Sequence, residues 1–517
     1  MTLYLWFVFF LAVQVVHFLG TWKLYQAAGR KSWEAAIPIY NAIVLMKIIS
    51  RPTWWTLLLF IPIINLIMFP VVWVETLRTF GKKSTLDTIL GIFTLGFYIY
   101  YVNYTQKLEH NANRELKPEN KTADTVSSLL FAVIVATLVH TYVIQPYTIP
   151  TSSLEKSLLI GDFLFVSKVN YGPRVPMTTV ALPMVHDSIP MTKKKSYLSW
   201  PQLPYFRLPA FEKIKRNDIV VFNWPVDTVH YFYEPKGRPG VIKPIDKKSN
   251  YVKRCVGIPG DSLSIKDGFV FINGKKLVLP ERAKPQYSYS VALDGKTSID
   301  FESLFKELDI TDPAGFRTEK RDTLYFRALT EAGAERLKNT PGVTAVKREI
   351  DTRDDNAIFP HINRWSQDNF GPIYIPEAGK TVSLTNESIP FYKEIITNYE
   401  GNTLELKGSK FIINGQETNT YTFKQNYYWM MGDNRHNSED SRYWGYVPEN
   451  HIVGKPVFIW MSWDTNGKGI NKIRWDRVFT TVDGEGQPQS YFKYFLIVLA
   501  LYFVGEFFWR KRKENKA

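Results

Sequence analysis

Residues 125–144 have the sequence TVSSLLFAVIVATLVHTYVI, and the stretch YTIPTSSLEKSLLIGD follows almost at once at 147–162. The first stretch is long and apolar enough for a helix that crosses the hydrocarbon of a bilayer. The second is rich in hydroxyl groups, with Thr151, Ser152 and Ser153 in succession. Such a composition by itself indicates only a turn. Its position directly after a predicted span makes these hydroxyls candidates for chemistry on a membrane-embedded substrate.

The composition describes a membrane protein with one large water-soluble body. Of the 517 residues, 45% are hydrophobic, and these concentrate in residues 1–145 and 491–509. The net charge is +15, but no basic helix with interleaved aromatic residues accompanies it, so nucleic-acid binding is not indicated. We interpret the charge as lysine and arginine flanking membrane spans. The single cysteine, Cys255, excludes an intramolecular disulfide.

Several other apolar stretches also predict membrane spans, about five crossings in all. They lie at 3–20, 54–74, 86–102 and 491–509. Pro62 and Pro70 in the second of these allow a kinked or re-entrant course there. A shorter apolar stretch at 37–49 predicts an interfacial segment. The last span ends in the basic sequence RKRK at 510–513, and Lys107, Arg114, Lys117 and Lys121 precede the span at 125–144. Because such charges stay in the cytoplasm, the residues between these two spans lie on the outer face.

The region between these spans predicts an all-β body. Short runs of β-branched and aromatic residues, each ended by turn residues, occur at 163–168, 218–224, 269–274 and 410–415. The last two end in Asn-Gly, a strong hairpin signal. Residues 175–215, rich in proline, predict a long surface loop. Residues 281–380 predict an inserted subdomain, because they contain charge-rich helical stretches at 304–308 and 330–337.

We therefore predict a membrane-anchored, mainly β protein with an inserted α/β subdomain and both N-terminal and C-terminal transmembrane helices. Its predicted parts are an N-terminal multi-span membrane region (1–124), a transmembrane helix (125–145), an extracytoplasmic domain (146–490, with the insertion at 281–380), a C-terminal transmembrane helix (491–509) and a basic cytoplasmic tail (510–517).

A lysine stands on the apolar, strand-like stretch YVKRCVGIPGD at 251–261. A lone lysine in such a place is most often a solvated surface residue. It acts as a general base only when neutral, and an exposed lysine has a pKa of about 10.4. Burial against apolar neighbours such as Val252 and Val256 would lower the pKa of Lys253, because desolvation disfavours the ammonium form.

A polar loop, MGDNRHNSEDSRYWG at 431–445, is the third candidate element. Its composition indicates an ordered turn. Paired carboxylate–guanidinium contacts among Asp433, Arg435, Asp440 and Arg442 would make the loop rigid, and Ser438 on a rigid loop could orient another side chain. Metal binding is the less favoured alternative, because the candidate ligands fit no standard spacing. Those ligands are Asp433, His436, Glu439 and Asp440.

With these elements in order, the chain resembles bacterial type I signal peptidase, the family of membrane-bound serine proteases that remove signal peptides. The family's serine motif, Pro-Ser-x-Ser-Met-x-Pro-Thr-Leu followed by Gly-Asp, aligns without gaps on residues 150–162. Its Lys-Arg-x-x-Gly-x-Pro-Gly-Asp motif matches 253–261, and its Gly-Asp-Asn-Arg-x-Asn-Ser-x-Asp-Ser-Arg motif matches 432–442. A strand motif ending in Asp-Ile-Val-Val-Phe is present at 218–222, with Asn217 where glycine is usual.

The resemblance implies a Ser–Lys dyad that needs no histidine, metal or cofactor. Ser153 would be the nucleophile and Lys253 the general base, with Ser438 orienting the lysine amine. The Ser153 N–H and the Thr151 hydroxyl would form the oxyanion hole. The remaining motif residues, which would support this site, are Arg254, Gly260, Asp261, Gly432, Asp433, Asn434, Arg435, Asp440 and Arg442.

The resemblance also implies the substrate and the place of action. Substrates would be the signal peptides of exported preproteins, with small residues at −3 and −1. The partners would be these preproteins, the lipid bilayer and a nearby secretion translocon, with no nucleic acid. The protein would be a multi-pass component of the bacterial inner membrane, with its catalytic domain on the periplasmic side.

The sequence departs from the family pattern within the serine motif. Leu154 replaces methionine and keeps an apolar side chain that can face lipid or the substrate groove. Ser152 replaces glycine, Lys156 proline and Ser157 threonine. A non-catalytic anchoring factor is one rival interpretation, although such a protein would be expected to lose Ser153 or Lys253. A self-cleaving Ser–Lys regulatory protease is another, but it predicts a cytoplasmic body.

Overall fold

The chain forms two compact units in the computed structural model. One unit comprises Met1–Val143, Pro173–Leu208 and Asp227–Ser249, and the other Ile144–Gly172, Pro209–Val226 and Asn250–Ala517. The described residues are 1–116, 121–192, 194–231, 234, 237–317, 319, 321–408, 410–464, 467–484 and 486–514. Lys117 and the last three residues of the predicted basic tail lie outside them.

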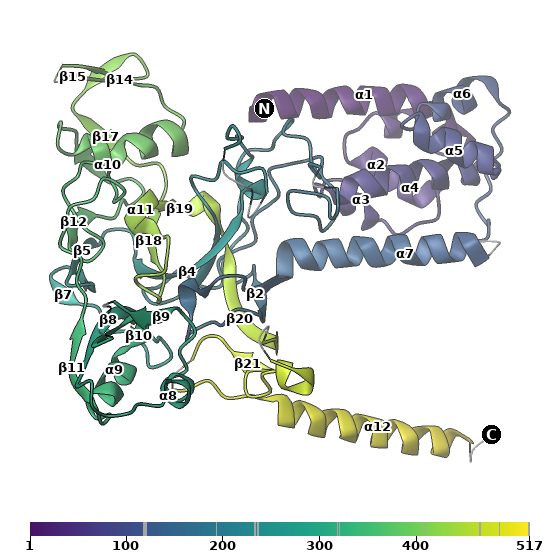
Figure 1. Ribbon diagram of the computed structural model, residues 1–517. Coiled ribbons are helices and arrows are strands. Elements are labelled where there is room, and N and C mark those ends of the chain that lie inside the picture. Colours follow the sequence, from purple (N-terminus) through teal and green to yellow (C-terminus); the bar gives the residue numbers. More distant parts are fainter. Residues whose placement is uncertain are drawn as a thin grey trace. The chain divides into compact units, whose positions relative to one another are not determined.

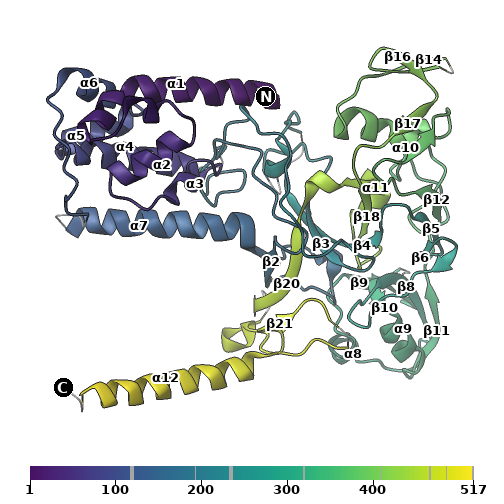
Figure 2. The ribbon, with the colours of Figure 1, turned by 180° about the vertical axis from the view of Figure 1, so that it is seen from behind.

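The first unit is helical. Its helices are α1 (Leu3–Ala27), α2 (Tyr40–Ile48), α3 (Trp55–Leu58), α4 (Ile64–Thr79), α5 (Thr85–Phe93), α6 (Tyr98–Thr105) and α7 (Lys121–Leu138), the last continued by a π-helical turn over Val139–Val143. Helices α1 to α6 pack together (Figure 2) around a core that includes Leu24, Tyr25, Met46 and Ile99. Residues 173–208 and 227–249 contribute loops with isolated β-bridges and a short 3₁₀ turn.

Fewer helices are long and apolar enough to cross a membrane than the five crossings expected from the sequence. Among the described residues these are α1, α7 with its π-helical extension, and α12 (Phe492–Glu514). The number is four if α5 and α6, which are bent by 119° at their junction, form one span.

The apolar stretch at 54–74 is not one continuous helix, in keeping with the kinked or re-entrant course that its two prolines allow. Helix α3 ends at Leu58 and α4 begins at Ile64. Pro62 lies in the gap, and Ile63 has a φ of +70°. A proline has no N–H for the helical ladder, and a positive φ is incompatible with a right-handed helix, so the helix is broken at this point.

The second unit is built on an antiparallel sheet with the order β1-β2-β20-β3-β4-β18-β19, and β21 pairs with β20. Strands β2, β4 and β20 of this sheet are labelled in Figure 1. The strands are β1 (Ile144–Thr148), β2 (Asp162–Ser167), β3 (Ile219–Asn223), β4 (Asn250–Gly257), β18 (Tyr427–Met431), β19 (Val447–Pro448), β20 (Ile452–Ser462) and β21 (Thr480–Thr481). Side chains alternate between the faces of a strand. Accordingly Ile219 and Val221 of β3 enter one core, and Val220 and Phe222 enter another.

Smaller sheets extend this body. They comprise β12 (Phe370–Tyr374), β5 (Ser262–Lys266), β6 (Phe269–Ile272) and β7 (Lys275–Lys276); β14 (Leu404–Lys407), β15 (Lys410–Ile413) and β16 (Gln416–Thr418); and the pair β13 (Thr381–Ser383) and β17 (Thr420–Thr422). Helices α10 (Ile389–Glu394) and α11 (Ser441–Trp444) lie between strands. Both Asn-Gly pairs form the predicted hairpin turns, with positive φ at Asn273, Gly274, Asn414 and Gly415.

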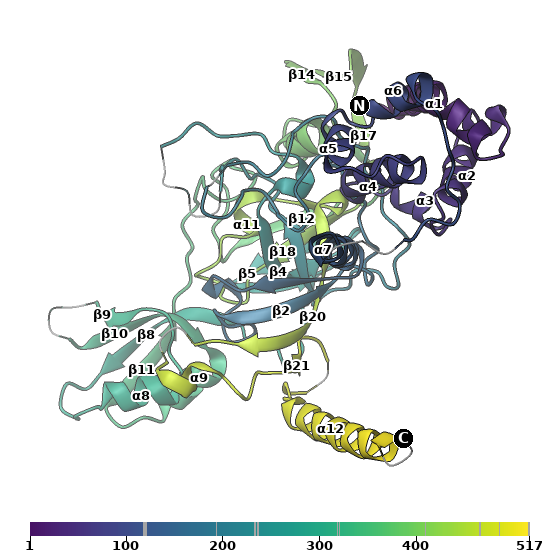
Figure 3. The same cartoon turned by 90° about the vertical axis from the view of Figure 1, so that its right-hand side faces the viewer.

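The inserted subdomain is an α/β unit, as predicted, but its elements span 286–348, and β12, which lies within the predicted range 281–380, pairs with β5 instead. Its sheet has the order β11-β8-β10-β9, with helices packed on it (Figure 3). The elements are β8 (Gln286–Leu293), α8 (Phe301–Glu307), β9 (Ala314–Phe316), β10 (Thr323–Thr330), α9 (Glu331–Lys338) and β11 (Val343–Arg348). It has a core of its own that includes Val291, Phe326 and Leu337.

Candidate active site

Ser153 lies on a single 3₁₀ turn, Ser152–Leu154, between β1 and β2. Apolar side chains fix this turn, because Leu154 and Leu158 are buried in the same core as Leu164 of β2. Leu154 is only 1% exposed, so the expectation that it faces lipid or a substrate groove is wrong. Its large apolar side chain serves to attach the turn to the core.

Lys253 lies on β4, with Val220 of β3 as its neighbour across the sheet. Its Nζ is 2.5 Å from Ser153 Oγ. Lys253 is 3% exposed and Ser153 8% exposed. Two residues that are 100 positions apart therefore meet in a nearly dry environment. This geometry would allow the amine to take a proton from the hydroxyl.

Burial lowers the pKa of Lys253 to about 8, because desolvation disfavours the ammonium form. The carboxylates of Asp440 and Glu439 raise this pKa, and the guanidinium of Arg442 lowers it. With a pKa of about 8, roughly a tenth of the amine is neutral at pH 7, far more than for an exposed lysine.

Two buried ion pairs hold the loop that follows β18. Arg254 donates from Nε and Nη2 to the two carboxylate oxygens of Asp433 at 2.8 and 2.6 Å. Arg442 similarly donates to Asp440 at 2.8 Å from each nitrogen. Arg435 is buried but forms no ion pair among the described residues. The loop is therefore held by one pair within itself and one pair to β4, and Arg435 is not part of the predicted pairing.

These ion pairs determine the charge state of the loop. Burial alone would raise the pKa of Asp433, but the adjacent Arg254 guanidinium overcomes this effect and holds that pKa below its usual range. Burial and Arg442 oppose each other in the same way at Asp440, where the pKa is also lowered. Both carboxylates are thus ionised at neutral pH.

Ser438 lies beside the dyad, but its hydroxyl has no hydrogen-bond partner in the described part of the chain. A Cβ on Gly432 would lie 2.2 Å from Ser438 Oγ and 2.5 Å from the Ser153 carbonyl oxygen. Glycine at 432 is therefore required by the close approach of these two segments. The orienting role of Ser438 stays a prediction.

Other predicted residues surround this centre. Thr151 precedes the serine turn and is exposed. Gly260 has a φ of +91°, and Asp261 beside it accepts two hydrogen bonds from Arg216 at 2.8 and 2.6 Å. Asn217, which replaces the family's glycine, has a φ of +74°. Asparagine tolerates this left-handed conformation better than most residues, so the replacement keeps the turn.

The residues considered for a metal site are used in other contacts. Asp433 and Asp440 form the ion pairs above, and His436 Nε2 lies 3.0 Å from both carboxylate oxygens of Asp368. Within the described ranges, no group of three or more His, Cys, Asp or Glu side chains is arranged to hold a metal ion.

Sequence reasoning missed Asn437 and Ser157, and did not foresee the contact of Asn434, among the polar residues that fix the serine turn. Asn434 donates its backbone N–H to the Ser153 carbonyl at 3.1 Å. Asn437 Nδ2 donates to Ser152 Oγ at 3.0 Å, and Ser157 Oγ donates to Asp433 at 2.5 Å. Asn434 and Asn437 belong to the polar loop motif, but their partners lie 282 and 285 residues away. Nothing in a local pattern identifies such partners.

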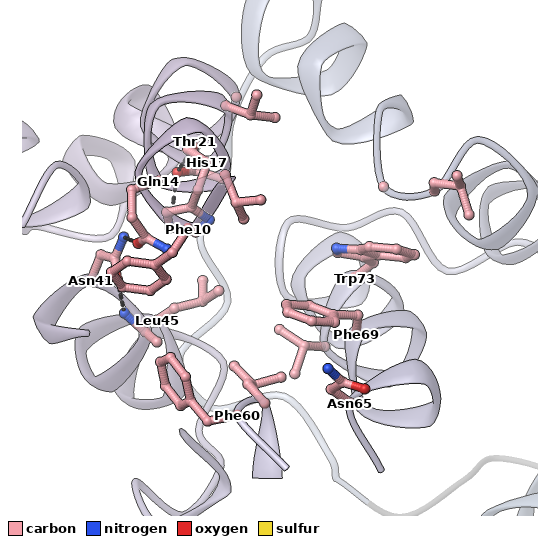
Figure 4. Close-up of a pocket in the computed structure, with 18 of the residues that line it drawn as sticks. Phe10, Gln14, His17, Thr21, Asn41, Leu45, Phe60, Asn65, Phe69 and Trp73 are labelled. Atoms are coloured by element: carbon pink, nitrogen blue, oxygen red, sulfur yellow. Dashed lines mark hydrogen bonds between the residues drawn. The ribbon is translucent and has the colours of Figure 1, made fainter. Parts of the chain in front are cut away.

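The first unit contains a separate cavity of about 480 Å³. Its lining is mainly apolar and aromatic and includes Phe10, Phe60, Phe69 and Trp73 (Figure 4). Polar side chains also reach it, and Asn41 Nδ2 donates to Gln14 Oε1 at 2.8 Å. None of the lining residues belongs to the motifs around Ser153, Lys253 or Ser438.

Comparison with known families matches two separate parts of the chain. The family described as signal peptidase, peptidase S26, matches residues 122–318 and 378–463. A family of unknown function matches residues 33–112. The dyad and the polar loop thus fall in the first match, and much of the helical first unit falls in the second.

Curated relatives extend the similarity over most of the chain. Signal peptidase I of Rickettsia canadensis (strain McKiel) is 30% identical over 358 residues, which is 68% of this chain and 86% of the relative. Signal peptidase I of Buchnera aphidicola subsp. Acyrthosiphon pisum is 25% identical over 414 residues, which is 77% of this chain and 98% of the relative. Signal peptidase I of Haemophilus influenzae is 25% identical over 385 residues, which is 72% of this chain and 80% of the relative.

Proposed function

Because this chain belongs to the signal peptidase S26 family, and is thus a membrane-anchored serine peptidase that cleaves signal peptides, we propose that Ser153 is its nucleophile and Lys253 its general base. The observation that carries this assignment is the 2.5 Å approach of Lys253 Nζ to Ser153 Oγ in a buried site. The lowered pKa of Lys253 supports the same roles, because a neutral amine is available as a proton acceptor.

In this mechanism the neutral amine of Lys253 accepts the hydroxyl proton while Ser153 Oγ attacks the scissile carbonyl carbon. The carbonyl π bond opens, and the negative charge moves to the oxygen. The ammonium of Lys253 then donates its proton to the leaving amine as the C–N bond breaks, leaving an acyl ester on Ser153. Lys253 next takes a proton from a water molecule that attacks the ester carbon, and returns this proton to Ser153 Oγ as the bond between Oγ and the acyl carbon breaks.

The oxyanion would be bound by the Ser153 N–H and the Thr151 hydroxyl. The first group lies on the serine turn and the second on the residue directly before it. Donors fixed before the reaction stabilise the developing charge without further reorganisation. Ser438, next to Gly432 at the dyad, would orient the amine of Lys253.

The proposed substrates are exported preproteins with small side chains at −3 and −1. We place the catalytic body on the periplasmic side of the bacterial inner membrane, near the secretion translocon. Basic residues at 510–513, in the last turns of α12, and at 107–121, up to the first residue of α7, support this orientation, because such charges stay in the cytoplasm. The serine turn follows α7 after a short strand, so the chain itself keeps the nucleophile close to a membrane span.

Cleavage of a purified preprotein by the full-length protein in detergent micelles tests the proposed specificity. Replacing a small −1 residue of the substrate by tryptophan should lower kcat/KM at least about 10²-fold, because a pocket shaped for a small side chain excludes a large one. The matched control places tryptophan at −2. Equal cleavage of the −1 and −2 variants would overturn the proposed specificity.

The pH dependence of kcat/KM tests the role of Lys253. Since the amine is active only when neutral and its pKa is about 8, activity should rise about tenfold per pH unit below that value and level off above it. Initial rates between about pH 6 and pH 10 measure this curve. A midpoint near that of an exposed lysine, about 10.4, would show that the titrating group is not the buried amine.

A further inference from the structure

The inserted subdomain places a carboxylate directly on the loop that holds the serine turn. Asp312 lies between α8 and β9, outside both helix and strand. One carboxylate oxygen accepts a hydrogen bond from Asn434 Nδ2 at 2.5 Å, and the other accepts one from Asn437 Nδ2 at 2.9 Å. A single acidic side chain of the insertion thus bridges two asparagines of the polar loop motif.

The same two amides reach the residue before the nucleophile. Asn434 Nδ2 also donates to the Ser152 carbonyl at 3.3 Å, and Asn437 Nδ2 donates to Ser152 Oγ at 3.0 Å. Each amide therefore lies between the carboxylate of Asp312 and Ser152. An ionised acceptor strengthens and directs such hydrogen bonds, so it holds both amides in the orientation that reaches Ser152.

The Ser152 carbonyl matters because it belongs to the same peptide group as the Ser153 N–H. The peptide group is planar, and its C=O and N–H point in opposite directions. Fixing the direction of the Ser152 carbonyl therefore fixes the direction of the N–H that would bind the oxyanion. A chain of hydrogen bonds runs from Asp312 through Asn434 to this peptide group.

A second contact attaches the insertion to the other end of the turn. Lys156 Nζ lies 2.6 Å from Asp309 Oδ2. Lys156 has a φ of +69°, which the proline usual at this position in the family could not adopt. A non-glycine residue in this region needs support from its surroundings. The ion pair with Asp309 provides such support, so residues 309 and 312 contact the turn on both sides of Ser153.

We propose that Asp312 is a positioning residue for catalysis, which orients the Ser152–Ser153 peptide group through Asn434 and Asn437. The proposal rests on the assignment of Ser153 as nucleophile and oxyanion donor. It gives the inserted subdomain a role in the chemistry, because the subdomain supplies a charge that the serine turn itself lacks. Asp312 does not touch the substrate in this proposal.

Steady-state kinetics of Asp312→Ala in the full-length protein tests this role. Since misplacement of about 1 Å can cost about 10²-fold, we expect kcat to fall about 10- to 100-fold, with KM changed less than about twofold. The fall in kcat should be smaller for Asp312→Asn, because its amide oxygen can still accept one of the two hydrogen bonds. Glu302→Ala, which removes a negative charge from α8 of the same subdomain, is the matched control and should behave like the wild type.

Two further measurements separate positioning from a general structural effect. Replacing Asn434 and Asn437 together by alanine should reduce kcat, and Asp312→Ala in that background should have little additional effect, because Asp312 acts through these two amides. The acid limb of the kcat/KM profile should keep its midpoint, since the base is untouched. A shifted midpoint would show that Asp312 acts on Lys253 instead. Additive losses, or wild-type kinetics of Asp312→Ala, would overturn the proposal.

The Ser153→Ala variant distinguishes a failure of the dyad assignment from a failure of the positioning role of Asp312. If Ser153→Ala retains activity, the dyad assignment itself is wrong and the role of Asp312 falls with it. If Ser153→Ala is inactive while Asp312→Ala cleaves like the wild type, only the positioning role is refuted.

Discussion

Replacing Ser153 by alanine is expected to reduce kcat/KM for preprotein cleavage by at least about 10⁴-fold, and Lys253→Met is expected to do the same. Ser153→Ala removes the nucleophile, and Lys253→Met removes the proton acceptor that lies 2.5 Å from it. Because the two side chains act as one unit, the double variant should be no less active than either single variant. Cleavage of a purified preprotein by detergent-solubilised protein measures all three.

The controls for this experiment are Ser262→Ala and Lys275→Met, which change the same residue types at exposed positions of β5 and β7. Both should cleave at the wild-type rate. Methionine at 253 keeps a long side chain in the buried site, so loss of packing contributes little. Substantial activity in either dyad variant would refute the mechanism.

Removing one partner of the buried Arg254–Asp433 pair should cause the largest loss of stability. Arg254 is 3% and Asp433 0% exposed, so Asp433→Ala leaves an arginine buried without its counter-charge. Such changes cost about 3–5 kcal/mol, which corresponds to a fall of roughly 10 °C in the melting temperature of a body of this size. Thermal unfolding followed by tryptophan fluorescence measures the change.

Two control variants show whether burial of the ion pair causes the loss of stability in Asp433→Ala. Arg336→Ala breaks an exposed ion pair with Glu307 and should change stability by no more than about 1 kcal/mol. Replacing both buried partners, as Arg254→Met with Asp433→Leu, should restore part of the loss, because no unpaired charge then remains. If Asp433→Ala and Arg336→Ala had the same melting temperature, the Arg254–Asp433 pair would stabilise the fold no more than an exposed ion pair does.

Local sequence patterns predicted those parts of the fold that depend on local chemistry. The strands at 163–168 and 218–224 and both Asn-Gly hairpins were predictable, because alternation and turn residues specify them within a few positions. The local pattern around Lys253 favoured a solvated surface lysine, and the role of general base came only from the resemblance to a known family. The resemblance to a known family added the pairing of this lysine with Ser153.

Contacts between distant residues could not be predicted in this way. Arg254 and Asp433 are 179 positions apart, and no local signal shows that Asp433 pairs with Arg254 rather than with Arg435 in its own loop. Pro62 and Pro70 indicated a kink in the stretch at 54–74, but the exact break between α3 and α4 could not be placed, because average hydropathy does not register a single residue of positive φ, here Ile63. Leu154 was misplaced because the direction of a side chain in a turn depends on the core that the turn meets.

The single cysteine gives the protein an internal reporter of its own opening. Cys255 is fully buried two positions after Lys253 on β4. Burial also raises the pKa of its thiol, and a protonated thiol reacts slowly with alkylating reagents. Alkylation of Cys255 in the native chain therefore requires β4 to separate from its neighbouring strands. The rate of alkylation measures how often this separation occurs. A second cysteine introduced on the surface would be modified first, which permits spectroscopic labelling without removing Cys255.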